Sequence, residues 1–142
     1  MKAAVFIVVV IALGAVGYWL VFDGSDNSSQ SRGGATTPLV DIVVAETLSP
    51  NAQIGKTAFE SKCAGCHGVN AVGQDGVAPP LVHVIYEPSH HGDKSFQRAI
   101  AVGVRGHHWP FGDMPPVEGL TRGDAAMIIS YVRELQRFNG IN

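Results

Sequence analysis

The stretch Cys63-Ala64-Gly65-Cys66-His67 decides how the rest of the chain is interpreted. Two cysteines three positions apart, with a histidine directly after the second, form the attachment signature of c-type haem. Thiols at this spacing each form a thioether with one vinyl group of the same porphyrin. The histidine that follows then lies under the iron, where an imidazole nitrogen is the proximal ligand. The sequence therefore predicts one covalent haem c, held by Cys63 and Cys66, with His67 on the metal.

Other uses of a Cys-x-x-Cys pair fit the chain less well. A thioredoxin-like redox pair stands in a βαβ setting, and no strand pattern flanks this motif. A zinc site would need two more ligands. His67 and one of the other histidines can supply them, but no paired-ligand spacing recurs in the chain. Both of the 2 cysteines belong to the motif, so none is left for a disulfide framework.

Length and composition allow one compact domain plus an appendage. The 142 residues are 46% hydrophobic and 15% charged, with a net charge of −2 when histidine is counted as neutral. This balance gives no basic footprint, which excludes nucleic-acid binding as a function class. In a domain this small, a covalently held porphyrin would supply much of the core.

The N-terminal residues read as a membrane anchor. Residues 3–22 carry no charge, and a helix of that length spans about 30 Å, the thickness of a bilayer core. The apolar part of a signal peptide is usually only about 7–15 residues long, and no Ala-x-Ala cleavage site follows. We therefore expect residues 1–22 to be an uncleaved single-pass transmembrane helix, with Lys2 on the cytoplasmic side.

Two further segments follow the predicted anchor. Residues 23–37 are rich in serine and glycine and lack apolar periodicity, as in a flexible linker. Residues 38–142 are expected to form the haem domain, with the apolar residues 38–48 lying against it. Because c-type haem is attached outside the cytoplasm, we expect a protein of the inner (cytoplasmic) membrane. Its haem domain would then lie on the periplasmic or extracytoplasmic side.

Two helices are predicted around the motif. The first begins at Ser49-Pro50, with a hydroxyl N-cap and proline at the first helical position, and it delivers the chain to the haem. The second follows Asp93 as its N-cap and ends at Gly103. Its inner face is formed by Phe96, Ala99 and Ile100. The Gly-rich residues 68–80 are expected to be a loop.

The last helix has the clearest sequence signals. Thr121 and Asp124 resemble a capping box, with aspartate in place of the usual glutamate. Gly140 supplies a stop. Apolar residues at i, i+3 and i+4 spacing predict a buried stripe made of Ala125, Ile128, Ile129, Val132 and Leu135. Residues 106–116, before this helix, are expected to be another loop.

Over about residues 54–138 the chain resembles the class I cytochromes c. Gly55 and Phe59 stand where this family packs its first helix against its last, and Tyr131 stands as the aromatic partner. The resemblance implies an all-α fold of three or more short helices around a covalently bound haem. The predicted N-terminal transmembrane helix would be added to that fold.

The resemblance also implies a partner for the proximal histidine. Residues 76–81 (Gly-Val-Ala-Pro-Pro-Leu) are similar to the family's loop after the haem motif. In that loop the carbonyl of the first proline accepts a hydrogen bond from the proximal histidine. Carried over, the acceptor is Pro79, and such a bond would fix the ring of His67 and raise its basicity.

Met114 is expected to be the distal ligand. It lies in residues 111–116 (Phe-Gly-Asp-Met-Pro-Pro), which resemble the Gly-x-Met-Pro loop before the family's terminal helix. A thioether is a soft ligand that favours ferrous iron, so His/Met ligation raises the reduction potential. An isolated methionine otherwise fills gaps in a core, which is the interpretation we adopt for Met127.

Five histidines depart from the family pattern, and three interpretations of them stay open. They can be solvated loop residues, some of them hydrogen-bonded to haem propionates as expected of Arg105 and Trp109. His90 and His91 can form an accessory metal site with His107 and His108, because imidazole suits copper and zinc, provided that the two loops converge. Alternatively, His107 or His108 replaces Met114 on the iron. The five are His83, His90, His91, His107 and His108.

The function expected from the resemblance is one-electron transfer. With both axial positions of the iron filled, the haem offers no open site for a substrate, so we do not expect the chain to be an enzyme by itself. Family inference gives membrane redox complexes as transient partners, such as a quinol-oxidising complex and a terminal oxidase or reductase. Docking of this kind is weak and buries little surface.

Three alternatives remain from the sequence. The chain can be the haem c subunit of a larger membrane oxidoreductase, with residues 38–48 as a docking surface. It can be a haem sensor, which needs an open or labile sixth position. It can also be a copper-handling protein built on a cytochrome scaffold, an idea motivated only by the histidines.

Overall fold

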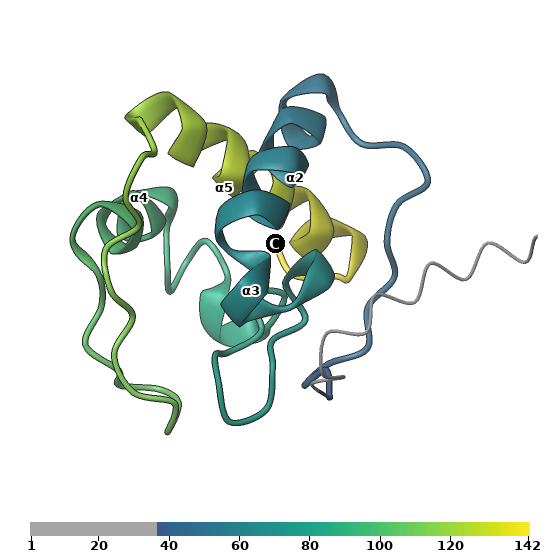
Figure 1. Cartoon of the computed structure of the whole chain (residues 1–142). Coiled ribbons are helices and arrows are strands. Elements are labelled where there is room, and N and C mark those ends of the chain that lie inside the picture. Colours follow the sequence, from purple (N-terminus) through teal and green to yellow (C-terminus); the bar gives the residue numbers. More distant parts are fainter. Residues whose placement is uncertain (1–36) are drawn as a thin grey trace, which may run out of the picture. The chain divides into compact units, whose positions relative to one another are not determined.

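The computed structural model describes residues 37–142. This part of the chain is helical and contains no β-strand, so the expected all-α fold is confirmed (Figure 1). Its elements in chain order are α2 (Pro50–Lys62), α3 (Ala64–His67), η1 (Val69–Ala71), η2 (Val84–Tyr86), α4 (Asp93–Val102) and α5 (Arg122–Phe138).

The predicted membrane anchor, residues 1–22, and the predicted linker up to residue 36 lie outside the described residues. Within residues 37–142, every helix is too short or too polar to cross a bilayer. The anchor, the linker and their boundaries stay predictions.

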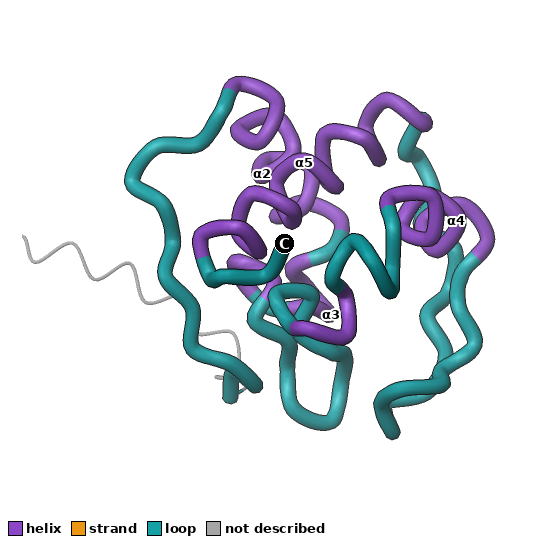
Figure 2. The backbone as a smooth tube through the Cα atoms, turned by 180° about the vertical axis from the view of Figure 1, so that it is seen from behind, coloured by secondary structure: helices purple, strands orange, loops and turns teal. Residues whose placement is uncertain are grey.

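Helix α2 begins as its sequence predicts. The Ser49 hydroxyl accepts a hydrogen bond from the backbone N–H of Ala52 at 3.4 Å, and proline occupies the first helical position. Its buried residues, Ala52, Gly55 and Phe59, recur at i, i+3 and i+7 and form one face. This face packs on α5 (Figure 2).

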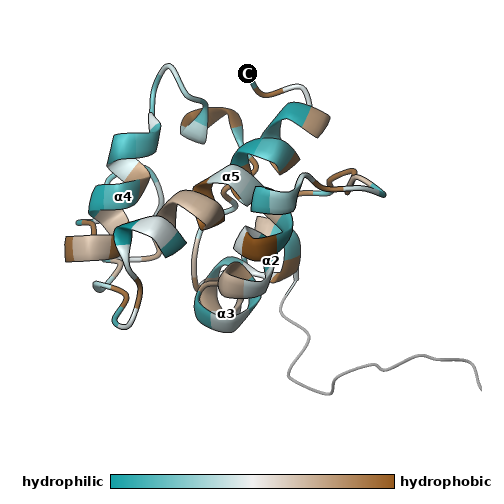
Figure 3. Ribbon diagram, turned by 90° about the horizontal axis from the view of Figure 1, so that it is seen from above, coloured by the Kyte–Doolittle hydropathy of each residue, from teal (hydrophilic) through white to brown (hydrophobic). Residues whose placement is uncertain are grey.

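Helix α5 has the predicted capping box. The Asp124 backbone N–H donates to the Thr121 hydroxyl at 3.1 Å, and the Asp124 carboxylate accepts from the Thr121 backbone N–H at 2.8 Å. All five residues of the predicted apolar stripe are buried. Hydrophobic and hydrophilic residues are interspersed along the helix (Figure 3). Gly140, just beyond its end, has the positive φ of 75° that glycine tolerates at a helix stop.

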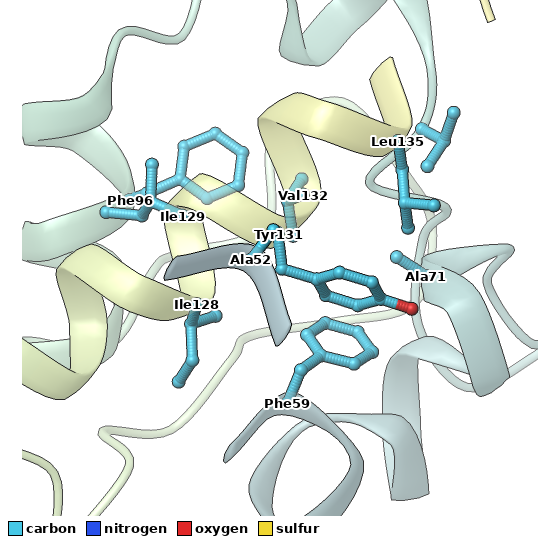
Figure 4. Packing of buried hydrophobic residues seen from close by; sticks show 10 residues of the cluster. Ala52, Phe59, Ala71, Phe96, Ile128, Ile129, Tyr131, Val132 and Leu135 are labelled. Carbon is cyan, nitrogen blue, oxygen red and sulfur yellow. The ribbon is translucent and has the colours of Figure 1, made fainter. Parts of the chain in front are cut away.

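The contact between α2 and α5 is built around a glycine and two aromatic rings. A Cβ added to Gly55 would lie 1.9 Å from the carbonyl oxygen of Met127, so the two backbones touch. The rings of Phe59 and Tyr131 pack next to this point, with centroids 5.6 Å apart (Figure 4). Burial, with a smaller contribution from Glu60, raises the pKa of Tyr131 to about 12. The expected packing of the first helix on the last is therefore confirmed.

Helix α4 differs from the prediction at its first residue. Its N-cap is Gly92, and Asp93 is the first residue inside the helix. The Asp93 carboxylate does not cap its own helix, because it accepts a hydrogen bond from Arg133 Nε on α5 at 2.8 Å. Phe96 and Ile100 are buried as expected, whereas Ala99, the third residue of the predicted inner face, is half-buried.

Residues 38–48 lie against the domain without regular secondary structure. The Leu39 backbone N–H donates to the carbonyl of Val72 at 3.1 Å. The Asn139 side chain bonds both backbone groups of Val43, at 2.8 and 2.9 Å. Ile42 and Leu48 pack against the hydrophobic core. The expected association of this segment with the domain is confirmed.

Removing the cap of α5 is expected to destabilise the protein. In a Thr121→Ala variant the Asp124 backbone N–H loses its acceptor, which costs about 1 kcal/mol of unfolding free energy. Bonds from Thr121, the backbone N–H first and then the hydroxyl, hold the pKa of Asp124 below its ordinary value of 3.8. A carboxyl group with a lowered pKa stabilises the fold at neutral pH. This stabilisation is lost as the pH falls through the lowered pKa. Urea unfolding at pH 7 and pH 3 should show a smaller difference between the wild type and the variant at pH 3.

Candidate functional site

The Cys-x-x-Cys-His motif forms one helical turn at the end of α2. Cys63 closes α2 and opens α3. Its carbonyl accepts hydrogen bonds from the backbone N–H groups of Cys66 at 3.1 Å and His67 at 2.9 Å. Both thiols are free, with Cys63 half-buried and Cys66 exposed. The turn therefore presents two unpaired thiols and the imidazole from neighbouring positions.

His67 is held in one orientation by its backbone neighbour across the loop. Its Nδ1 lies 2.9 Å from the carbonyl oxygen of Pro79, the contact that the resemblance implies. Because a carbonyl only accepts, Nδ1 carries the proton and Nε2 keeps its lone pair. Burial lowers the pKa of His67, and the bond to Pro79 partly offsets this effect. His67 is 8% exposed, and its neutral ring offers Nε2 as a metal ligand.

The loop after the motif depends on two glycines and on a residue that the sequence did not single out. Gly68 and Gly73 both have positive φ, and a Cβ on either would lie 2.6 Å from backbone atoms. The Gln74 side chain reaches back and donates to the carbonyls of Ala64 and Gly65, each at 3.0 Å. Gln74 thus ties the loop to the motif through bonds that the sequence does not signal.

The two thiols differ in their surroundings. Burial, with a smaller contribution from the charge of Cys66, raises the pKa of Cys63 to about 11. At neutral pH this thiol is protonated, and because the thiolate is the nucleophilic form, it is protected from adventitious disulfide exchange. It remains available for a thioether bond.

Met114 lies on a backbone hairpin before α5. Its backbone N–H and carbonyl each pair with Val104, at 2.9 Å in both directions. Two glycines allow the close approach: a Cβ on Gly103 would lie 2.5 Å from the Met114 carbonyl, and one on Gly106 would lie 2.5 Å from the Gly112 carbonyl. Met114 is half-buried on this fixed hairpin. Its role as distal ligand stays a prediction.

Trp109, at the tip of the hairpin, has a donor without an acceptor. Its indole stacks on Phe111, with centroids 5.8 Å apart and planes at 10°, and forms a T-shaped pair with the ring of His83, with centroids 5.2 Å apart. Burial raises the pKa of Tyr86, and the nearby indole partly offsets the rise. The indole N–H is buried and near the Tyr86 hydroxyl, but it makes no hydrogen bond of standard geometry within the described residues. A poorly satisfied buried donor is costly, and a haem propionate would give it a better acceptor.

These residues fit a covalent haem. Two free thiols, an oriented imidazole with a free Nε2 and a buried indole N–H without a hydrogen bond of standard geometry fit such a group. Arg105 is exposed, and its carbonyl accepts a hydrogen bond from His107. Its predicted contact with a propionate stays a prediction.

The two loops that carry the histidines lie together in the structure. From the sequence, this convergence was only a condition for an accessory metal site. The rings of His90 and His91 lie 5.3 and 5.2 Å from the ring of His108. His107 packs on His108 at 4.3 Å. Partial desolvation and the charges of the three neighbouring histidines lower the pKa of His108. His83 lies apart, with its Nδ1 accepting from the backbone N–H of Ile85 at 3.2 Å.

Two buried polar residues of α5 also shape this region, and sequence reasoning missed them. Arg133 donates to the carbonyls of Tyr86 and His91, and Gln136 donates to the carbonyls of Leu81 and Tyr86. The helical spacing could have revealed both residues, because they stand four and seven residues after Ile129, on the apolar side of the helix. Polar residues at such positions indicate a buried hydrogen-bond network.

Comparisons with known proteins point to the same cofactor as the geometry of the site. The family model described as cytochrome c matches residues 52–136. The chain is also similar to a protein named thiosulfate dehydrogenase from Psychrobacter arcticus, at 34% identity over 100 residues. That alignment covers 68% of this chain but 29% of the relative, so the chain spans less than a third of the relative's length.

Proposed function

The chain belongs to the class I c-type cytochromes and binds haem c covalently, and on this premise we propose that it is a membrane-anchored one-electron carrier. The observation that supports the proposal is that both expected axial donors lie on backbone held by hydrogen bonds. His67 is oriented by Pro79, and Met114 lies on a hairpin closed by Val104. When both donors bind, no position is left for a substrate.

The haem supplies one-electron exchange between the ferric and ferrous states of its iron. The chain fixes the group and sets its environment. Cys63 and Cys66 would hold the macrocycle through thioethers, and His67 would offer Nε2 to the iron while Nδ1 keeps its proton and donates it to the Pro79 carbonyl. The soft sulfur of Met114 favours the ferrous state. The Trp109 indole N–H would donate to a propionate and keep that edge of the macrocycle in place.

The proposed place of action is the outer side of the inner membrane. The uncharged residues 3–22 support an anchor, and the composition of residues 23–37 supports a flexible tether. On such a tether the haem domain can reach successive membrane complexes, for example a quinol-oxidising complex and a terminal oxidase or reductase. We do not expect the chain alone to catalyse a net reaction.

A second candidate rests on the relative named thiosulfate dehydrogenase. The chain would then be an electron-accepting haem subunit, or a dedicated acceptor, for an enzyme that oxidises an inorganic sulfur compound. Residues 38–48 offer a docking surface for that role, because Val43 is 66% exposed. Recovery of a stoichiometric partner after mild detergent extraction would favour this candidate over a shuttle.

A redox titration with a thiosulfate challenge tests the carrier proposal. The full chain, loaded with haem, should titrate as a single reversible one-electron couple. The ferric protein should stay ferric when thiosulfate is added alone, because no substrate site is open. Rapid reduction by thiosulfate, saturating with its concentration, would contradict the carrier proposal and make the chain an enzyme.

A further inference from the structure

We propose that His90, His91 and His108 form a second metal site, separate from the haem iron, which binds a divalent transition-metal ion. One ring nitrogen from each histidine lies within 4.8 Å of the other two. The three come from two segments far apart in sequence, namely the turn before α4 and the tip of the hairpin that carries Met114. This site goes beyond one-electron transfer and does not depend on it.

His91 is the fixed member of the site. Its Nδ1 lies 2.7 Å from the Ile85 carbonyl, so Nδ1 carries the proton and Nε2 keeps its lone pair. Metal-binding histidines commonly have such a carbonyl behind them, which orients the ring and raises its basicity. Tyr86 packs against the same ring, with centroids 5.2 Å apart.

The backbone that carries His91 is anchored in the core. The buried guanidinium of Arg133 donates to the His91 carbonyl and to the Tyr86 carbonyl, and its Nε pairs with Asp93. The His91 backbone N–H donates to the Glu87 carbonyl at 2.8 Å. Two bonds to the His91 backbone therefore hold this ligand in place before any ion arrives, and the bonds of Arg133 to Tyr86 and Asp93 fix the segment on either side. A rigid support of this kind is what a tight metal site requires.

His90 and His108 complete the site from more exposed positions. Two nitrogens bound to one tetrahedral ion at about 2.0–2.1 Å lie about 3.4 Å apart. Closing the set from within 4.8 Å to that separation is a movement that exposed rings achieve by rotation about χ1 and χ2. His107 packs on His108 at 4.3 Å, while its own Nδ1 lies 2.9 Å from the Arg105 carbonyl. We assign His107 a positioning role.

The chemistry of the donors selects the ion. Three imidazoles suit copper and zinc, whereas magnesium and calcium require oxygen ligands. No carboxylate belongs to the set of three in the described part of the chain. Divalent copper binds nitrogen ligands more tightly than zinc does, so we expect copper to be preferred when both are offered.

Occupancy would couple two parts of the fold. The ion would tie the segment before α4, which Arg133 anchors to α5, to the hairpin that presents Met114. Because an ion that binds only the folded state stabilises it, a hundredfold excess over the dissociation constant increases the folding equilibrium constant about 100-fold. The site would therefore stiffen the loop on which the distal ligand is expected to lie.

Calorimetric titration of the full haem-loaded chain tests the site. The protein is kept ferric and freed of other metals by a chelator, and Zn(II) or Cu(II) is then added. We expect one ion per chain and tighter binding of Cu(II), whose electron paramagnetic resonance spectrum should show coupling to imidazole nitrogens. His91→Gln and His108→Gln should each weaken binding by at least the roughly 10–100-fold that loss of even an outer-shell partner costs.

His83→Gln is the matched control, because His83 lies in the same segment but outside the cluster. It should leave the affinity for Zn(II) unchanged. Unchanged absorption spectra of the haem would show that all variants remain folded, and His108 is exposed enough for its replacement to be tolerated. Absence of saturable binding of either ion would overturn the proposal. Binding that His91→Gln and His108→Gln leave intact would overturn it equally.

Discussion

A Gly55→Ala variant is expected to lose at least about 3 kcal/mol of unfolding free energy, at the upper end of what overpacking costs. The added methyl group would lie 1.9 Å from the Met127 carbonyl oxygen and 2.4 Å from the carbonyl carbon. These are backbone atoms of α5, so the two helices must move apart. The close contact of Phe59 with Tyr131 would open with them. For a domain of this size, the melting temperature should fall by roughly 12 °C or more.

The sign of this prediction distinguishes packing from helix propensity. Within a helix, alanine is favoured over glycine by about 1 kcal/mol, so propensity alone would stabilise the variant. Gly123→Ala is the matched control, because Gly123 lies in α5 and the nearest atom to its added methyl group is Thr121 Oγ1, at 3.5 Å. It should be neutral or slightly stabilising in urea unfolding. If Gly55→Ala behaves like this control, the described crossing of α2 and α5 is wrong.

Met114→Leu is expected to open the sixth position of the iron. Leucine keeps the apolar volume and the hairpin, whose backbone bonds to Val104 do not involve the side chain. The variant lacks the soft sulfur that favours ferrous iron, so its potential should fall by on the order of 0.1 V, within the span of about 0.8 V that axial ligation covers. Its ferrous form should bind carbon monoxide stoichiometrically.

Met127→Leu is the control for the distal ligand. Met127 lies in α5 and is half-buried, so its replacement removes a thioether of the same chain without touching the hairpin. Potential and carbon monoxide reactivity should match the wild type. If Met114→Leu also matches the wild type, Met114 is not the ligand, and a histidine of the hairpin tip, His107 or His108, becomes the candidate.

The parts of the fold that local chemistry dictates were predictable from the sequence. The caps of α2 and α5 depend on residues within three positions of each other, such as Thr121 and Asp124. The buried stripe of α5 follows from helical spacing alone. The contact of Gly55 and Phe59 with α5 was predictable only through the family resemblance, since no local rule brings two helices together.

Features that depend on the meeting of distant segments were not predictable. Asp93 was predicted to cap α4, but its carboxylate pairs with Arg133 instead. No local sequence signal reveals that Arg133 lies across from it. The sequence shows His90 and His91 on one predicted loop and His107 and His108 on another, but it does not give the distance between the loops. Arg133 and Gln136 both donate to the carbonyl of Tyr86 and hold the first loop against α5, and these contacts are equally absent from any local pattern.

The absorption spectrum of the oxidised wild-type protein, followed by addition of carbon monoxide to the reduced form, tests the central claim most directly. Ligation of the iron by His67 and Met114 predicts a weak methionine-to-iron charge-transfer band in the near infrared and no reaction with carbon monoxide. A closed site of this kind is what an electron carrier needs. Absence of the band together with rapid carbon monoxide binding would contradict the account and indicate a sensor or an enzyme.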